Sequence, residues 1–170
     1  GFVDTTGFVP ADSAAFALAA NPVTLTLRDA QGRLVLGPPT DEHFRGWTRL
    51  PALGRDADGT WSAAFALDAG MPVFGLGEQF GPLDKRGQLV RCHVDDALGV
   101  NTALTYKPCP FAWGFTAEGT CWGILVNTPC DVWFGCGHPA WSHRTLAIAC
   151  ADAALDLFVE KGCAATRSDE

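Results

Sequence analysis

The sequence predicts an all-β fold, an antiparallel β-sandwich, and three observations lead to that prediction. Apolar and polar residues alternate with a period of two in several short segments, as they do in half-buried strands. Gly, Pro and Asp residues separate these segments and supply turns. No stretch of the 170 residues has the spacing of a long amphipathic helix. Short strands divided by turns favour a sandwich or a barrel.

The first predicted element is a hairpin in the N-terminal quarter of the chain. Val23, Leu25 and Leu27 alternate with polar residues, which indicates a half-buried strand. Residues 29–32, with the sequence DAQG, are turn formers, and residues 33–36 return as the second arm. Further along, residues 47–50 and 61–67 flank the turn sequence GRDADG, so we expect a strand on each side of it.

The second half of the chain predicts another hairpin and a closing strand. Aromatic residues alternate along residues 111–115, the sequence AEGT at residues 117–120 forms a turn, and residues 121–126 are the returning strand. We expect the last strand at residues 155–159. Residues 151–158 also have some helical propensity, but this segment is short and lacks a clear cap.

The remaining segments are predicted to be loops. Residues 37–46 and 81–108 lack a periodic pattern, and the second of these loops is unusually long. Long loops are uncommon in compact domains and are often functional. The final residues, ATRSDE, are typical of a frayed end.

Composition excludes several classes of partner. The formal net charge is −7 and only three lysines are present, which argues against nucleic acid because phosphate binding needs clustered cations. No segment approaches the roughly 20 apolar residues of a membrane span, so we expect no membrane partner. The apolar residues 14–20 follow no basic segment, so we do not interpret them as a signal peptide.

The seven cysteines are an odd number and include no CxxC pair. We therefore expect free, mostly buried thiols and a cytoplasmic location, in preference to a disulfide framework. Cys130, Cys136 and His138 lie close in sequence, but no fourth zinc ligand is evident. We expect no metal and no other cofactor.

Three motifs follow one another in the second half of the chain. They are FGLGEQFGPLDKRGQ at residues 74–88, YKPCPFAWGF at residues 106–115 and CWGILVNTPCDVWF at residues 121–134, and LDLFVEKG closes the series. In this order they resemble the N-terminal β-sandwich domain, of the galactose mutarotase-like type, of glycoside hydrolase family 31. That family contains α-glucosidases and α-xylosidases. The resemblance covers residues 73–162.

The resemblance implies a domain organisation and a role. Residues 1–162 would form the N-terminal sandwich, and residues 163–170 would lead to a catalytic (β/α)8 barrel that this sequence lacks. The family's nucleophile signature, Trp-x-Asp-Met-Asn-Glu, is also missing. We therefore expect a non-catalytic domain that packs on the barrel of the same chain and shapes the site for a carbohydrate substrate. The parent would be a retaining α-glycosidase.

The segment RCHVDDALGVN carries the candidate site residues. In the family a loop of the sandwich reaches over the barrel mouth and brings an acidic residue to the aglycone side of the substrate. The Asp-Ala match gives this role to Asp96, with Asp95 beside it. A carboxylate can accept charge-assisted hydrogen bonds from two sugar hydroxyls. The alternative is an acidic turn in which the Asp side chains cap their own backbone.

Other residues in the motifs have mainly structural interpretations. Gly75 and Gly77 permit a left-handed backbone between bulky neighbours. Glu78 is expected to be a buried acceptor for backbone donors or for Arg86. Trp113, Trp122 and Trp133 are expected more often in the core than in a sugar-stacking platform.

Two further functions stay open. An independent carbohydrate-binding module would bind glycans without a barrel. A mutarotase-like sugar epimerase would need an acid and a base at the sugar ring, and the histidines that could contribute are His93, His138 and His143.

Overall fold

The computed structural model describes residues 15–20, 23–42, 44–45, 48–49, 51–95 and 107–162. Within these ranges the fold is all-β, and every strand pairing is antiparallel. No helix among them is long and apolar enough to cross a membrane. The predicted fold class is therefore confirmed.

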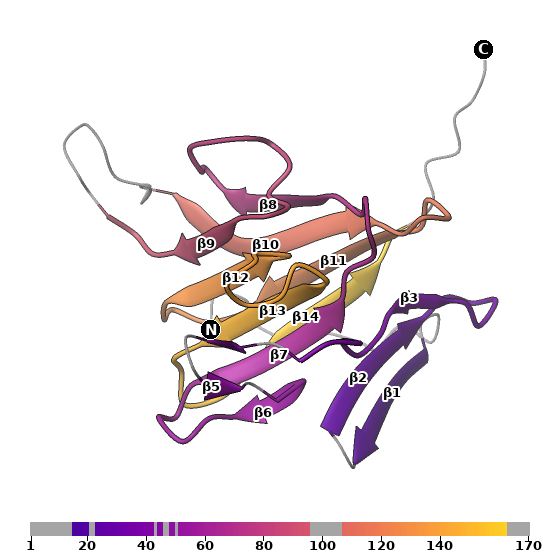
Figure 1. Ribbon diagram of the computed structural model, residues 1–170, viewed down its shortest axis with the longest axis horizontal. Helices are drawn as coiled ribbons and strands as arrows, with labels where there is room; N and C mark the ends of the chain where they lie inside the picture. Colours follow the sequence, from indigo (N-terminus) through magenta and orange to yellow (C-terminus); the bar gives the residue numbers. More distant parts are fainter. Residues whose placement is uncertain are drawn as a thin grey trace, which may run out of the picture.

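Two sheets form the sandwich (Figure 1). The four-stranded sheet has the order β14-β11-β10-β8, and its strands are β8 (Val73–Gly77), β10 (Pro108–Phe115), β11 (Cys121–Val126) and β14 (Leu157–Lys161). The five-stranded sheet has the order β6-β7-β13-β12-β9, and its strands are β6 (Leu53–Arg55), β7 (Trp61–Ala66), β9 (Leu89–Cys92), β12 (Val132–Cys136) and β13 (Thr145–Cys150).

Two smaller sheets accompany the sandwich. The three-stranded sheet consists of β1 (Ala15–Ala20), β2 (Val23–Arg28) and β3 (Leu34–Leu36). It contributes Leu27, Val35 and Leu36 to the main core. A two-stranded sheet consists of β4 (Phe44–Arg45) and β5 (Thr48–Arg49).

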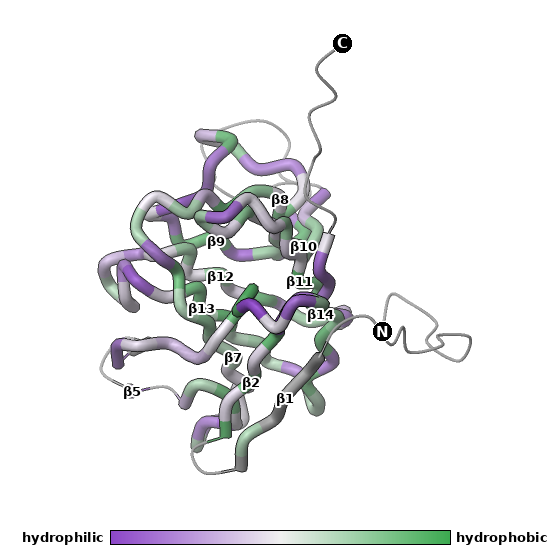
Figure 2. Tube along the Cα trace, turned by 90° about the vertical axis from the view of Figure 1, so that its right-hand side faces the viewer, coloured by the Kyte–Doolittle hydropathy of each residue, from purple (hydrophilic) through white to green (hydrophobic). Residues whose placement is uncertain are grey.

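The core lies between the two main sheets and follows from the period-two pattern of their strands. Trp122, Ile124 and Val126 alternate along β11 and are fully buried. They belong to the same apolar cluster as residues of the opposite sheet, such as Phe65 and Phe134. Apolar residues accordingly recur along the strands of both sheets, with hydrophilic turns between them (Figure 2).

The three tryptophans of the sequence analysis do not form one platform. Trp122 is buried in the core, whereas Trp113 lies half-buried near Phe74, with ring centroids 4.8 Å apart. Trp133 packs with a separate small cluster that includes Trp141, on the other side of the five-stranded sheet from the core. The core interpretation is thus correct for Trp122 alone.

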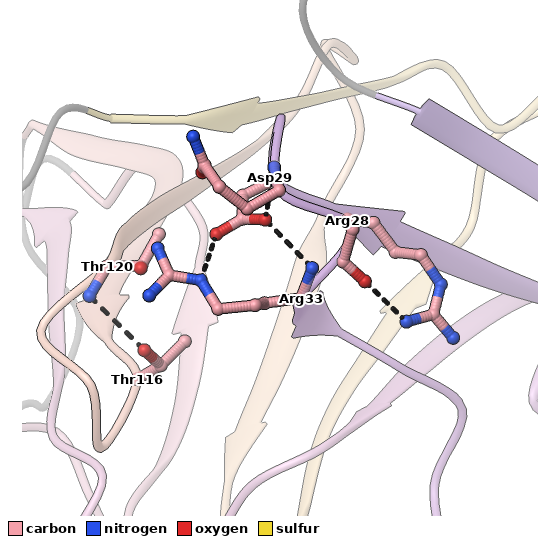
Figure 3. Close-up of polar contacts among 7 residues, drawn as sticks. Arg28, Asp29, Arg33, Thr116 and Thr120 are labelled. Atoms are coloured by element: carbon pink, nitrogen blue, oxygen red, sulfur yellow. Dashed lines mark hydrogen bonds and ion pairs between the residues drawn. The ribbon is translucent and has the colours of Figure 1, made fainter.

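The predicted hairpin around residues 29–32 is confirmed, and Asp29 holds its turn (Figure 3). The Asp29 Oδ1 atom accepts hydrogen bonds from the backbone N–H groups of Gln31 and Arg33, at 2.9 and 2.8 Å. Its Oδ2 atom pairs with Arg33 Nε at 2.6 Å. Burial raises the pKa of Asp29, and the bonds and charge of Arg33 lower it by more. Gly32 completes the turn with a φ of 78°.

The predicted left-handed backbone at Gly75 and Gly77 is also confirmed. Both glycines have positive φ, and so does the buried Leu76 between them. A Cβ atom on Gly75 would lie 2.3 Å from the carbonyl oxygen of Phe111, and one on Gly77 would lie 2.4 Å from the Lys107 oxygen. β8 can therefore approach β10 this closely only with glycine at these positions.

Charged side chains fix the loop between β8 and β9, residues 78–88, to the backbone. Arg86 Nη1 donates to the carbonyl oxygens of Asp68 and Met71, both at 2.8 Å, and Nη2 donates to that of His143 at 3.2 Å. The buried Lys85 donates from Nζ to the Pro82 oxygen at 2.7 Å. Arg86 thus joins the loop to two other segments of the chain.

The expectation for Glu78 is wrong. Its side chain is 67% exposed and lies 3.9 Å from Lys107 Nζ in a surface ion pair. Arg86 makes its bonds to backbone carbonyls instead. The two glycines around Leu76 rotate the backbone, so that Leu76 fills the core and Glu78 points to solvent.

Several boundaries differ from the sequence-based expectation. The predicted loop of residues 81–108 contains β9, and the predicted loop of residues 37–46 contains β4. The sequence analysis does not predict strands at the positions of β1, β6, β8, β12 and β13. The final strand runs two residues later than expected, and no helix is described near it. Of residues 47–50, Trp47 and Leu50 lie outside the described residues.

Candidate functional site

The candidate site lies where β9 ends and the chain leaves for β10. Residues 91 and 93 are two apart on an extended backbone, so Arg91 and His93 project to the same face. β9 pairs with β12, with Cys92 opposite Val132, and Asp131 immediately precedes β12. This register brings the side chains of Arg91, His93 and Asp131 together at the edge of the five-stranded sheet.

Asp131 is bonded through both carboxylate oxygens. Arg91 donates to Oδ2 from Nε at 3.0 Å and also from Nη2, and His93 Nδ1 lies 2.6 Å from Oδ1. The Arg91 guanidinium is stacked over Trp133, with its Cζ atom 5.2 Å from the ring centroid. The side chains of Arg91, His93 and Asp131 are 40, 38 and 26% exposed, so the cluster is accessible from solvent.

The electrostatics of the cluster favour an ionised Asp131. Partial burial raises the pKa of this carboxyl, whereas the hydrogen bonds and charges of His93 and Arg91 lower it by more. Asp131 therefore carries a negative charge at neutral pH. That charge orients the guanidinium and the imidazole next to the outgoing loop.

A cavity of about 230 Å³ lies beside the cluster. It is bounded by the end of β9, the start of β10 and the β11–β12 turn, and its lining residues are Cys92, His93, Val94, Pro108, Pro110, Thr128, Pro129, Cys130 and Asp131. Ligand pockets usually have volumes of roughly 300–1,000 Å³. The cavity formed by the described residues is therefore smaller than a typical ligand pocket.

The β11–β12 turn is a rigid wall of this cavity. Thr128 donates from Oγ1 to Asp152 Oδ2 and accepts from the backbone N–H of Cys130 at 3.0 Å. Asn127 donates to Asp156 Oδ2 at 2.7 Å. The bond from Thr128 lowers the pKa of Asp152, so this acceptor is ionised at neutral pH. Two carboxylates from the β13–β14 connection thus hold the turn in place.

The two acidic residues predicted from the sequence follow directly on this cluster. Asp95 is half-buried and lies two residues beyond His93. Asp96 lies outside the described residues, so its role stays a prediction. The chain is described again from Lys107, just before β10. The structure therefore places Asp95 at the base of the β9–β10 connection.

Sequence reasoning missed the partnership of Arg91 and Asp131. Their separation of 40 positions in the sequence hides it, because only the pairing of β9 with β12 brings them together. One signal was available: Arg91 and His93 are spaced by two in a segment that was interpreted as a loop. A cationic pair with strand spacing indicates a polar edge that needs an acidic partner.

A larger hollow, of about 740 Å³, lies away from the predicted residues, next to β2 and β6. Its charged lining residues are already paired: Arg49 Nη2 lies 3.0 Å from Glu42, and Asp41 lies 3.7 Å from Arg144 Nε. Its described lining residues include three prolines, and none of those described residues offers an aromatic ring on which a sugar could stack. The smaller cavity is therefore the better candidate.

The cysteines differ in exposure: among those described, Cys92, Cys136 and Cys150 are buried, whereas Cys109 and Cys130 are exposed. The six cysteines within the described part of the chain are free, as predicted, and Cys163 lies outside it. Burial raises the pKa of Cys92 and that of Cys136 to about 12, so both thiols stay protonated. No group of three His, Cys, Asp or Glu residues that could hold a metal ion is found among the described residues.

The other two histidines of the three considered from the sequence, His138 and His143, lie in the β12–β13 connection. His138 Nδ1 accepts a hydrogen bond from the Ala140 N–H at 3.2 Å, which is a local turn interaction. His143 is exposed, and its carbonyl oxygen accepts from Arg86. Of the three histidines of the sequence analysis, His93 is the one that lines the cavity.

Two characterised enzymes have similar sequences. The chain is 34% identical over 104 residues to the 1,3-α-isomaltosidase of Kribbella flavida, which covers 59% of this chain and 14% of that enzyme. It is 39% identical over 67 residues to the α-xylosidase of Emericella nidulans, which covers 39% of this chain and 8% of that enzyme. The chain thus spans only a small part of these relatives.

Solved structures and a family model agree with each other. The chain superimposes on a GH31 dextranase of Flavobacterium johnsoniae with a TM-score of 0.65 and 20% identity, over 87% of this chain and 16% of that one. A cycloalternan-degrading enzyme of Trueperella pyogenes superimposes with a TM-score of 0.55 and 17% identity, over 82% of this chain and 23% of that one. These likenesses show the fold. The family model for the glycosyl hydrolase 31 N-terminal galactose mutarotase-like domain matches residues 4–135, and the chain belongs to that family.

Proposed function

We propose that this domain is a non-catalytic part of a retaining α-glycosidase, and that its β9–β10 connection forms one wall of the carbohydrate site. In this arrangement the sandwich packs on a catalytic barrel in the same polypeptide. The barrel provides the reacting carboxylates, and the sandwich provides polar side chains at the rim.

The observation that carries the proposal is the geometry at the base of the connection. Arg91, His93 and Asp131 fix its first residues beside a cavity that is too small to hold an oligosaccharide alone. A loop that starts from a rigid polar anchor can hold Asp95 and Asp96 in position for a ligand bound mainly by another domain. The similar proteins are a 1,3-α-isomaltosidase, an α-xylosidase and a dextranase, so the proposed substrates are α-linked glycosides.

Chemistry also favours a non-catalytic role for the sandwich itself. Retaining hydrolysis needs two carboxyl groups about 5 to 5.5 Å apart, one as nucleophile and one as acid and base. Asp131 is bonded to Arg91 and His93 through both of its oxygens, so it is not available as a nucleophile. The role that fits such a group is positioning.

The test is Asp96→Ala in the full-length enzyme, with Asp95→Ala beside it. A lost charged hydrogen bond to a sugar hydroxyl costs about 1.5 to 3 kcal/mol, so kcat/KM on α-glycosides should fall roughly tenfold or more. The melting temperature should stay unchanged, because a loop residue of this kind contributes within about 0.5 kcal/mol to folding. An unchanged kcat/KM on every α-glycoside that the enzyme cleaves would show that Asp96 does not contribute to the carbohydrate site. A lower melting temperature would make it a loop cap.

A mutarotase-like epimerase is the second candidate, and the cavity that His93 and Asp131 share is the observation that favours it. An imidazole beside a carboxylate can transfer a proton to or from a sugar. Polarimetry of α-D-glucose and α-D-galactose with the purified domain tests this function. Faster anomer equilibration that is lost in His93→Asn would establish it, and a rate equal to that of buffer would exclude it.

A further inference from the structure

Phe80 and Leu83 are the most exposed large apolar side chains among the described residues, at 76 and 78%. Both lie in the β8–β9 loop, three positions apart. Single exposed apolar residues are common on protein surfaces, but two that project from one short loop form a patch. Such a patch is a feature of interaction sites.

The β8–β9 loop is well anchored, so poor anchoring does not explain the exposure of these two side chains. Lys85 donates from its backbone N–H to the Val73 oxygen at 2.6 Å, and Gly87 donates to the Cys136 oxygen at 2.7 Å. Pro82 lies between the two apolar residues, and its carbonyl accepts from the buried Lys85 ammonium group. The structure thus uses a buried cation to fix the segment that holds Phe80 and Leu83 in solvent.

The position of the loop links it to the candidate site. β9 has four residues, so roughly 10 to 13 Å separate the end of the β8–β9 loop from the base of the β9–β10 connection. Figure 1 shows the β8–β9 loop above the sandwich, with β9 leading from it toward that connection. Val94, 62% exposed, adds an apolar side chain at the far end of β9. A domain that covers the candidate site is therefore large enough to reach the β8–β9 loop as well.

We propose that Phe80 and Leu83 are the apolar anchor by which the sandwich docks on the catalytic domain of its own polypeptide. This inference rests on the proposed function, in which that domain completes the 230 Å³ cavity. Two observations favour this occupant: the patch and the candidate site lie at the two ends of the short strand β9, and the chain spans only 16% of the dextranase that shares its fold. The docking site on the partner is an apolar pocket, because two uncharged side chains enter it.

The test is hydroxyl-radical footprinting of the full-length protein, read by mass spectrometry at single residues. Leu34 is the matched control, because it is also a leucine and is 50% exposed on β3. On a bare sandwich Leu83 should oxidise faster than Leu34. In the docked enzyme Leu83 should oxidise several-fold more slowly than Leu34. Phe80 should be protected from oxidation in the same sample.

Each outcome bears on the inference. Faster oxidation of Leu83 than of Leu34 in the full-length protein overturns it. Protection of Leu83 that disappears on dilution overturns it too, because the occupant is then a second copy. Hydrolysis of an aryl α-glucoside by the same sample separates the two proposals. An active enzyme with a reactive Leu83 contradicts only the docking surface, and an inactive protein with a protected Leu83 contradicts only the proposed function.

Discussion

The two ends of β9 use charged residues in different ways. At the N-terminal end, Asp84, Lys85 and Arg86 bond mainly to backbone groups: Asp84 Oδ1 accepts from the N–H groups of Val73 and Arg86, and the two cations donate to carbonyls. At the C-terminal end, Arg91, His93 and Asp131 bond to one another, and they border a cavity.

This difference separates charges that serve folding from charges that are available for function. A carbonyl oxygen in a bent loop needs a donor, so a cation that meets this need cannot be removed without leaving a polar group unsatisfied. A half-exposed cluster of side chains contributes little to stability. We therefore expect large losses of stability from changes at the β8–β9 side and small ones at the β9–β10 side.

Gly77→Ala should have the largest effect. Its Cβ atom would meet the backbone of residues 107 to 109, at 2.4 Å from both the Lys107 oxygen and the Cys109 nitrogen, in a left-handed conformation. The loss in unfolding free energy should be about 3 kcal/mol or more, because conformational strain of about 1–2 kcal/mol adds to overpacking. Chemical denaturation of the domain measures it. Gly119→Ala is the control, because Gly119 also has a positive φ, of 81°, but an added Cβ atom there would have no neighbour within 4 Å. An equal loss of unfolding free energy in both variants would show that the close packing at β8 is unimportant.

Arg86→Ala should cause the second-largest loss of unfolding free energy. It removes three hydrogen bonds to carbonyl oxygens from three different residues, and the expected loss is about 2–3 kcal/mol. Arg28→Ala is a suitable control, because Arg28 makes one exposed bond to the Gly32 oxygen and should contribute within about 0.5 kcal/mol. Similar urea midpoints for the two variants would contradict the stabilising role assigned to the three hydrogen bonds of Arg86.

Local sequence patterns predicted the parts of this fold that depend on near neighbours. The β2–β3 turn follows from Asp29 and Gly32, whose conformations and bonds lie within five residues. The β10–β11 hairpin follows in the same way, with the Thr116 N–H donating to the Thr120 oxygen at 2.9 Å. Turn chemistry and period-two alternation are sufficient there.

Long-range pairing explains what the sequence did not predict. β9 was interpreted as a loop because Leu89, Val90, Arg91 and Cys92 mix apolar and charged residues in a segment too short to establish a period. Its strand conformation comes from β12, whose residues pair with it across 40 or more positions of the sequence. The same pairing creates the bond between Arg91 and Asp131, so the sequence did not predict this cluster. The family resemblance predicts a role for Asp95 and Asp96, and that role stays a prediction.

Asp131→Asn should have a small effect on stability at neutral pH. The pair with Arg91 is partly exposed, so its loss should cost below about 1 kcal/mol. The effect should depend on pH, because the pKa of Asp131 is lowered in the folded state. Its contribution is complete above the ordinary value of 3.8 and is lost as pH falls through the lowered folded value. Urea titrations of the wild type and the variant should therefore differ at pH 7 and converge in acid; a constant difference would refute the assignment.

The smallest effect on the sandwich itself should come from Phe80→Ser combined with Leu83→Ser. Both side chains are more than three-quarters exposed, so little apolar contact is lost in the isolated domain. The unfolding free energy should change within about 0.5 kcal/mol. Leu76→Ser is the contrasting variant in the same motif, because Leu76 is fully buried and its replacement should cost several kcal/mol. In the full-length protein the double variant should lower the melting temperature, since there the two side chains are buried against the second domain. A double variant that already destabilises the isolated sandwich would mean that Phe80 and Leu83 pack on their own domain, and the β8–β9 loop would then serve folding alone.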